Sequence, residues 1–215
     1  MNQLTRRFMK LIRKQRMNQN KDSPGGGQSP DQIESQWLKA ISRGDRQAFE
    51  AFYQAYFPRL LRFSHRITGQ LNGLEEIVND VMLVIWQKAD TYDDTCRPST
   101  WVFGIAYNKC RHALRREKRQ SLNVALEDTE SELFDRQNMI GDHETSEWLN
   151  AAFAILSPDQ RTVLELTYFY GMSYQEIARI MKCPENTVKT RMFHARKKLQ
   201  KILPGLAGLP TGELS

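Results

Sequence analysis

Hydrophobic residues recur at steps of three and four along most of this chain, the spacing that places side chains on one face of an α-helix. The first such stripe runs over residues 49–67 and the second over residues 74–86. A polar, aspartate-rich loop over residues 91–98 precedes a third long helix, which Ser99 or Thr100 is expected to cap. No segment alternates with a period of two, so the pattern predicts an all-α fold.

The C-terminal part returns to helical spacing over residues 147–203 and carries two sequences typical of helix starts. In each, a serine is followed three residues later by a side chain that can complete a capping box: Ser157 with Gln160, and Ser173 with Glu176. Gly171 and Pro184 are expected to end the two short helices, and the last helix is expected over residues 187–199.

Composition separates these stretches into two domains. Residues 1–31 are basic and low in complexity and predict a flexible tail, and residues 120–145 are acidic and predict a flexible linker. We therefore expect two small helical domains over residues 32–119 and 146–203, followed by a flexible tail over residues 204–215. The basic N-terminal tail is read as solvated, with contact to a membrane surface or a nucleic acid as the alternative.

Charge and cysteine content indicate the kind of partner and the cellular compartment that suit this chain. The formal net charge of +6 suits a polyanionic partner. The three cysteines, Cys96, Cys110 and Cys183, are far apart, which argues against a disulfide scaffold and fits a reducing cytoplasm. No apolar run reaches the roughly 20 residues that a membrane span needs, and no secretory signal is recognisable. We expect a cytoplasmic protein without stable membrane insertion.

The two helices after Ser173, over residues 174–181 and 187–199, are expected to form a helix-turn-helix. Ala178 supplies the small residue where they cross, and residues 182–186 make the turn, with Lys182 where many such turns have glycine. The second helix is basic, so its start is expected to read base edges in a DNA major groove while later residues hold phosphates. The alternative is a solvated basic helix. The residues expected to contact DNA are Lys189, Thr190, Arg191, His194, Arg196 and Lys197.

Two ordered sets of motifs resemble the bacterial sigma factors. The segments LSPDQR (156–161), GMSYQEIA (171–178) and PENTVKTR (184–191) resemble sigma domain 4. The segment EEIVNDV (75–81) resembles the region that docks on core RNA polymerase, and STWVFGIAYN (99–108) resembles the region that reads the −10 element. With no middle domain between them, the pair is similar to the extracytoplasmic-function subgroup of the sigma-70 family.

The resemblance implies a docking surface for the clamp helices of the large catalytic polymerase subunit. It falls on the second helix of the N-terminal domain, at Asp80, Leu83, Val84, Trp86 and Gln87. The apolar members of this set, Leu83, Val84 and Trp86, are alternatively part of the hydrophobic core.

The resemblance also implies contacts with promoter DNA. The loop from Tyr92 to Pro98 is expected to form a pocket for an extruded −10 base, which Asn108 contacts. Trp101 is expected either to wedge the duplex edge or to lie in the core. The −10 phosphates are assigned to Lys109, Arg111, Arg115, Arg116, Lys118 and Arg119. In domain 4, Phe193 joins the −35 residues named above, with core packing as its alternative.

No catalytic constellation is recognisable, so neither an enzyme nor a cofactor nor a small-molecule substrate is expected. An intrinsic metal or redox sensor is a minor alternative, for which Cys96 is the residue to test. The function expected is a sigma factor that binds core RNA polymerase and recognises −10 and −35 elements, in a stress or envelope response, and that an anti-sigma factor holds. The alternatives are a helix-turn-helix regulator outside the polymerase and a nucleic-acid enzyme.

Overall fold

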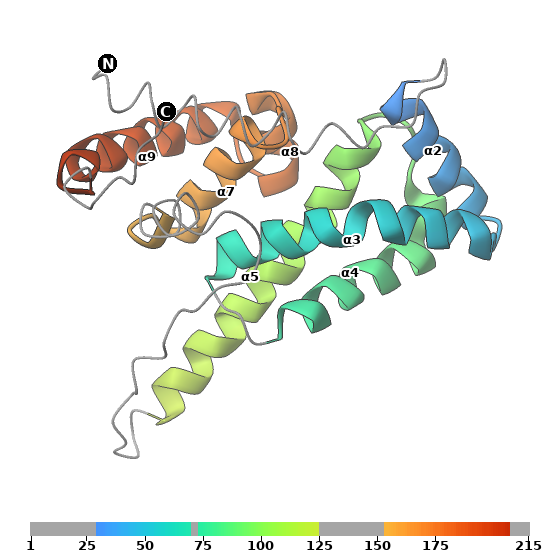
Figure 1. Ribbon diagram of the computed structural model, residues 1–215, viewed down its shortest axis with the longest axis horizontal. Helices are drawn as coiled ribbons and strands as arrows, with labels where there is room; N and C mark the ends of the chain where they lie inside the picture. Colours follow the sequence, from blue (N-terminus) through green and yellow to red (C-terminus); the bar gives the residue numbers. More distant parts are fainter. Residues whose placement is uncertain (1–28, 70–72, 125–152, 207–215) are drawn as a thin grey trace, which may run out of the picture.

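The computed structural model describes residues 29–69, 73–124 and 153–206, and its regular structure in these ranges is helical throughout (Figure 1). An N-terminal module contains the first helices of the described chain, and a C-terminal module contains the last ones. The N-terminal module consists of α2 (Pro30–Ile41), α3 (Arg46–Thr68), α4 (Leu74–Lys88), the 3₁₀ turn η1 (Ala89–Thr91) and α5 (Pro98–Val124). The C-terminal module consists of α7 (Pro158–Tyr168), α8 (Tyr174–Met181) and α9 (Glu185–Leu206).

The predicted hydrophobic stripes form the interior of the N-terminal module. On α3, the side chains of Phe52, Tyr56, Leu60, Phe63 and Ile67 are fully buried. The stripe of α4 packs against α3 and α5 in the same way. At the end of α3, Gly69 adopts a left-handed φ of 69° and donates its N–H to the carbonyl of His65. Helical spacing in the sequence therefore identified the buried face correctly.

Helix boundaries differ from the sequence expectation at several points. α9 runs over Glu185–Leu206, longer at both ends than the expected 187–199, and continues past residue 204, where the flexible tail was expected to begin. α2 begins at Pro30, inside the predicted tail, because Ser29 and Gln32 form a capping box around it. The prediction that Ser99 or Thr100 caps the third helix is wrong. Pro98, whose fixed φ suits a first helical position, opens α5. α5 also continues to Val124, beyond the predicted linker start at residue 120. The expected tails over 1–28 and 207–215, and the linker residues 125–145, lie outside the described residues.

The helix-turn-helix has the predicted construction. Ser157 with Gln160, and Ser173 with Glu176, form complete capping boxes at the starts of α7 and α8. Ile177, Met181, Val188 and Met192 are buried between the helices. Lys182 adopts a left-handed conformation, φ 50° and ψ 50°, and its N–H bonds back to the end of α8. A lysine thus occupies a turn conformation that glycine adopts more cheaply.

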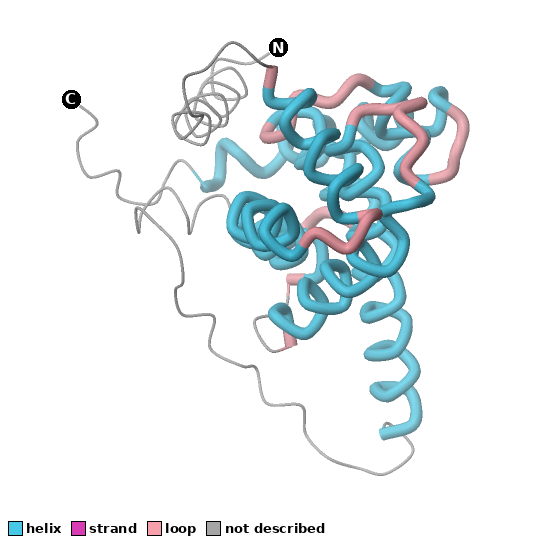
Figure 2. Tube along the Cα trace, turned by 90° about the vertical axis from the view of Figure 1, so that its right-hand side faces the viewer, coloured by secondary structure: helices cyan, strands magenta, loops and turns pink. Residues whose placement is uncertain are grey.

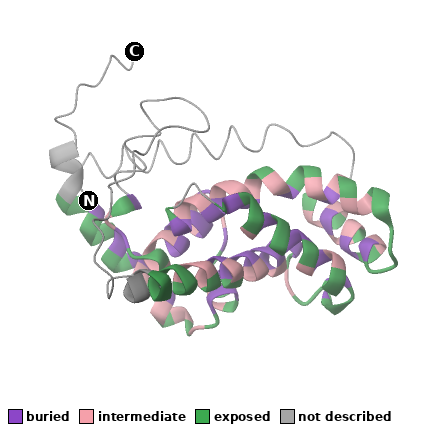
Figure 3. Cartoon of the chain, turned by 90° about the horizontal axis from the view of Figure 1, so that it is seen from below, coloured by how far each residue is buried: buried purple, intermediate pink, exposed green. Residues whose placement is uncertain are grey.

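The two modules pack against each other. α7 packs beside α3, and α8 packs against α5, where Glu176 accepts a hydrogen bond from Thr100 in the first turn of α5 (Figure 1). In the view turned by 90°, the helices lie close together with short loops between them (Figure 2). Seen from below, buried residues lie on the sides of the helices that face neighbouring helices, and exposed residues lie on the outer sides (Figure 3). Side chains of both modules belong to one hydrophobic cluster.

Candidate nucleic-acid interface

The second helix of the helix-turn-helix, α9, presents a polar face to solvent over its first turns. Lys189, Thr190, His194 and Lys197 are exposed. The Lys189 ammonium lies 2.8 Å from the Glu185 carboxylate one turn earlier, and the Thr190 hydroxyl donates to the carbonyl of Asn186 at 2.9 Å. An exposed pair of this kind is worth little, so Lys189 can exchange Glu185 for another anion at small cost.

Phe193 lies on this same exposed face. Its side chain is 61% exposed, and its ring makes an edge contact with His194 at 5.5 Å between centroids. The alternative prediction, that Phe193 packs in the hydrophobic core, is therefore wrong. The inward positions of α9 are taken by Val188, Met192 and Ala195, which leaves residue 193 on the outer side. Phe193 therefore belongs to the same solvent-facing side of α9 as Lys189, Thr190 and His194.

Two arginines of the predicted set have protein partners. The Arg191 guanidinium lies 2.5 Å from the carboxylate of Asp159 in the first turn of α7, and it also contacts the Cys183 sulfur at 3.5 Å. Arg196 donates to the hydroxyl of Tyr168 at 2.6 and 3.1 Å. Arg191 lines an open cavity of about 370 Å³ between the start of α7 and α9. The sequence did not indicate Asp159 as its partner, because the two residues are far apart in the chain.

The loop between η1 and α5 folds over the Tyr92 side chain and buries it. The Tyr92 side chain is buried, and its hydroxyl donates to the carbonyl of Cys96 at 2.9 Å. Burial, together with the negative charge of Asp94, raises the pKa of Tyr92. The Trp101 ring is half-buried with its centroid 5.8 Å from that of Tyr92. The two rings therefore pack together on the inner side of the loop and hold its conformation.

A groove of about 540 Å³ runs along the outer side of this loop. It lies between the loop and α2, and Ser35, Lys39, Tyr92 and Asp94 line part of it. Asp94 adopts a left-handed φ of 58° and is held there by Lys39 at 2.5 Å and by the Ser35 hydroxyl at 2.7 Å. Contacts from α2, which the sequence had not connected with this loop, thus fix its conformation.

The basic residues of α5 follow the helix away from the loop. Asn108, Arg115, Arg116, Lys118 and Arg119 are exposed, whereas Lys109 and Arg111 are half-buried. The Arg111 guanidinium lies 5.6 Å from the centre of the Tyr107 ring. The Lys109 ammonium lies 2.8 Å from the Asp80 carboxylate of α4. The basic residues that the sequence assigned to the −10 phosphates thus follow one another along α5, and the first of them, Lys109, is paired with Asp80.

The predicted polymerase-docking residues lie on one side of α4. Asp80, Leu83 and Gln87 are exposed, while Val84 and Trp86 are half-buried. The exposed fraction of the Leu83 side chain is 52%. The alternative that Leu83 belongs to the core is therefore wrong. Trp86 packs its ring edge-on against Phe49 of α3, with 5.1 Å between centroids, and keeps part of its surface in solvent.

Burial reduces the expected reactivity of two of the three cysteines. Burial raises the pKa of the half-buried Cys96 thiol, and it raises the pKa of the buried Cys110 thiol to about 11. Both shifts lower the thiolate population on which cysteine reactivity depends. Among the described residues, no three histidine, cysteine, aspartate or glutamate side chains gather at one point. In the same part of the chain, every helix is too short or too polar to cross a bilayer.

Two family profiles match the chain, in the order of the two modules. "Sigma-70 region 2" matches residues 52–120, and "Sigma-70, region 4" matches residues 146–199. The chain is 25% identical to the RNA polymerase sigma-H factor of Pseudomonas aeruginosa, an alignment that covers 80% of this chain and 95% of that protein. It is 26% identical to the ECF RNA polymerase sigma factor SigW of Bacillus subtilis, over 79% of this chain and 96% of the relative.

Two solved structures resemble this fold. The sigma factor RpoE of Bartonella quintana, in complex with the anti-sigma factor NepR, aligns with a TM-score of 0.61 and 26% identity. That alignment covers 73% of this chain and 96% of the other. The structure of CnrH with the cytosolic domain of CnrY aligns with a TM-score of 0.59 at 20% identity, over 80% of this chain and 98% of that one, and so supports the fold.

Proposed function

Because the chain belongs to the extracytoplasmic-function group of the sigma-70 family, and is thus a sigma factor that directs transcription initiation, we propose how its surfaces divide that work. The side of α4 around Leu83 binds core RNA polymerase, α5 with its preceding loop reads the −10 element, and α9 reads the −35 element. The observation that carries this division is the exposure of Leu83 and Phe193, two large apolar side chains on separate modules that the fold leaves in water.

At the −35 element, the first turns of α9 enter the major groove. Lys189, Thr190 and Arg191 lie where base edges are within reach, and Phe193 packs on bases or sugars. Lys197 and Arg196, farther along the helix, hold phosphates. The Asp159 carboxylate orients the Arg191 guanidinium, so Arg191 reaches the groove with fewer side-chain conformations to lose.

At the −10 element, the groove between α2 and the loop accepts a base that has left the stack. Its carboxylate and hydroxyl groups, at Asp94 and Ser35, can bond to a base edge, and Asn108 adds an amide farther along α5. The exposed arginines 115, 116 and 119 follow the backbone of the strand, as a channel for single-stranded DNA requires. Tyr92 and Trp101 support the loop, and the exposed part of Trp101 can stack at the duplex edge.

At the polymerase, Asp80, Leu83 and Gln87 supply a charged, an apolar and an amide contact, with Val84 and Trp86 at the rim. An anti-sigma factor is the second protein partner, because the sigma factor RpoE, similar to this chain in sequence and fold, is solved with one. The chain acts in the cytoplasm, as a specificity subunit and not as an enzyme.

Transcription with purified core polymerase tests this proposal. The chain is expected to support specific initiation on promoter templates found by mapping its transcripts, and Asp80→Arg is expected to abolish assembly. Glu50→Arg, a charge reversal at an exposed position of α3, is the matched control and should assemble normally. DNA binding without polymerase binding would instead favour a helix-turn-helix regulator outside the polymerase.

A further inference from the structure

The first described helix, α2, is anchored on α3 through its buried face. Leu38 and Ile41 lie in the hydrophobic core. The Glu34 carboxylate accepts from the Tyr56 hydroxyl and, at 2.9 Å, from the Arg59 guanidinium, both of α3. Tyr56 is fully buried and Glu34 is 9% exposed. A carboxylate in such surroundings is tolerable only while its partners face it, so the position of α2 on α3 is fixed.

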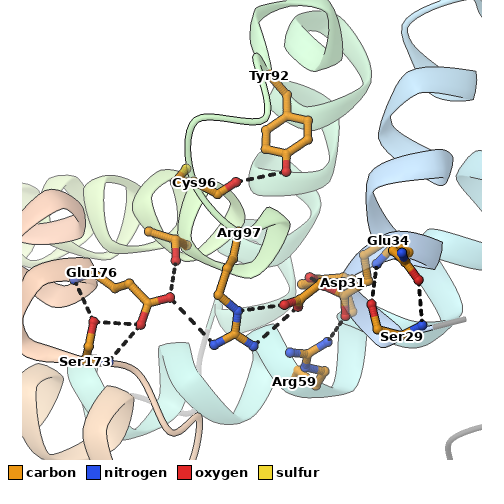
Figure 4. A network of polar contacts seen from close by, with 12 residues as sticks. Ser29, Asp31, Glu34, Arg59, Tyr92, Cys96, Arg97, Ser173 and Glu176 are labelled. Atoms are coloured by element: carbon orange, nitrogen blue, oxygen red, sulfur yellow. Dashed lines mark hydrogen bonds and ion pairs between the residues drawn. The ribbon is translucent and has the colours of Figure 1, made fainter.

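The opposite side of α2 contacts the loop of residues 92–97, which we call the −10 loop. Three polar residues spaced four apart, Asp31, Ser35 and Lys39, share this side, since such spacing places side chains one above the other on a helix. Asp31 accepts from the Arg97 guanidinium at 2.9 and 3.3 Å (Figure 4). Ser35 and Lys39 both bind the Asp94 carboxylate. One face of α2 therefore holds the −10 loop at two points.

Asp94 is the position where the −10 loop depends on these contacts. Its φ of 58° is left-handed, a conformation that an aspartate adopts less readily than a glycine. Hydrogen bonds from Lys39 and Ser35 lower the pKa of the Asp94 carboxyl, so the carboxylate stays charged. The bond from the Tyr92 hydroxyl to the Cys96 carbonyl closes the loop across this position. Without α2, Asp94 is free to return to a negative φ, which moves one wall of the groove.

The contacts between α2 and the −10 loop matter more for binding than for folding. The two ion pairs, Lys39 with Asp94 and Arg97 with Asp31, keep much of their surface in water, and exposed pairs of this kind add little to the stability of a fold. A loop that is already ordered, however, loses less conformational freedom when a ligand binds to it. The α2 contacts therefore lower the entropic cost of binding at the groove.

We propose that Asp31 and Lys39 of α2 are positioning residues of promoter recognition: they hold the −10 loop in its binding conformation and act through the loop rather than through contacts of their own with DNA. This inference rests on the proposed function, because it takes the groove beside the loop as part of the −10 reader. α2 precedes residue 52, where the region 2 match begins, so that match assigns no role to it.

Holoenzyme reconstituted from the full chain and core polymerase tests this role. The probe is a fluorescent single-stranded oligonucleotide with the −10 sequence of a promoter mapped from the chain's transcripts, and a scrambled oligonucleotide is the reference. Asp31→Ala and Lys39→Ala should each weaken binding to the −10 oligonucleotide roughly fivefold and leave the scrambled one unchanged. Arg43→Ala, which removes an exposed cation four residues after Lys39, is the matched control and should bind as the wild type does.

Two further measurements separate positioning from direct contact. In an Asp94→Gly background, which lacks the partner of Lys39, Lys39→Ala should have no further effect on −10 affinity. In the free chain with Cys183→Ser, Asp31→Ala and Lys39→Ala should make the Cys96 thiol of the −10 loop react several-fold faster with a disulfide reagent, because the loop opens more often. The melting temperature of these variants should change by less than about 2 °C.

The proposal is overturned if Lys39→Ala weakens binding to both oligonucleotides equally and lowers its salt dependence, which would indicate a phosphate contact. It is also overturned if the Lys39→Ala effect persists in the Asp94→Gly background, or if the Cys96 rate stays at the wild-type value. Failure of the proposed function would look different: wild-type holoenzyme would bind both oligonucleotides equally, although the α2 variants still speed Cys96 labelling, and the role of α2 in recognition would fall with it.

Discussion

Glu176 and Thr100 join the two modules through a carboxylate that serves two helices at once. One oxygen of Glu176 accepts from the backbone N–H and hydroxyl of Ser173 and so caps α8, while the other accepts from Thr100 at the start of α5. A residue that the sequence marks as part of a capping box thus also belongs to the contact between the two modules. Its replacement by glutamine, which can complete a capping box, separates the two roles.

The pH dependence of stability should report on Glu176. Burial works to raise its pKa, but the hydrogen bonds from Ser173 and Thr100 outweigh burial, and the pKa lies below the ordinary 4.5. A lowered folded-state pKa gives a stabilisation that is complete above the unfolded value and is lost as pH falls through the folded one. The melting-temperature difference between wild type and Glu176→Gln should be constant from pH 7 to about 5 and should shrink below about 4.5. A difference that grows on acidification would contradict this.

Phe193→Ala and Met192→Ala form a matched pair on α9. Phe193 is exposed, so its loss should leave unfolding almost unchanged but weaken binding to a −35 duplex by at least about 1 kcal/mol, or roughly fivefold. Met192 is buried, so its truncation should lower the free energy of unfolding by about 2–4 kcal/mol. Denaturant melts and fluorescence anisotropy measure the two effects. Equal DNA affinities for Phe193→Ala and wild type would remove Phe193 from the DNA surface.

Arg191 and Asp159 should act as a unit in DNA recognition. Arg191→Ala is expected to cost about 1–3 kcal/mol in −35 binding if the guanidinium bonds to a base. Asp159→Asn should cost less, because it only releases the guanidinium from its partner at 2.5 Å. In the double variant the Asp159 effect should disappear, which a double-mutant cycle measures. Additive losses would show that Asp159 acts elsewhere. Equal weakening of Arg191→Ala on unrelated duplexes would indicate a phosphate contact instead.

Leu83→Ala should weaken assembly with core polymerase without affecting the fold. The side chain is 52% exposed, so the melting temperature should change by less than about 2 °C, whereas the polymerase affinity should fall about fivefold or more. Val81→Ala, two residues earlier and fully buried, should show the converse: lower stability and, once folded, the same affinity. Titration of labelled chain with core polymerase gives both affinities. Unchanged affinity for Leu83→Ala would discard this side of α4.

Thiol labelling should distinguish the three cysteines. Cys110 is buried, its sulfur lies 3.4 Å from the Ser64 hydroxyl, and burial raises its pKa to about 11. At pH 8 it should therefore react only as fast as the protein unfolds. Cys96 and Cys183 are half-buried and should react faster. Mass spectrometry after timed quenching identifies the labelled site, and early labelling of Cys110 would show that the N-terminal module opens locally.

The sequence predicts local features better than long-range ones. The period of α3 and α4 located the buried faces, and the two capping boxes located the starts of α7 and α8, because both signals lie within a few residues of each other. For Phe193 the sequence left core packing open as an alternative, because an aromatic side chain in a helix usually packs inward, and its 61% exposure removes that alternative. Asp159 as the partner of Arg191, and Arg66 as the partner of Glu165, could not be predicted, since contacts between residues far apart in the chain depend on tertiary packing that no local spacing records.

The ion pair between Asp80 and Lys109 joins the proposed polymerase surface to the proposed −10 surface. The same carboxylate faces the proposed polymerase surface and neutralises the first cation of the α5 ridge, at 2.8 Å. When polymerase draws Asp80 into its own contacts, the Lys109 ammonium loses its counter-charge and gains affinity for a phosphate. Reciprocity then requires DNA at Lys109 to favour polymerase at Asp80 by the same factor. Holoenzyme formation and promoter capture would thus be thermodynamically linked through a single salt bridge.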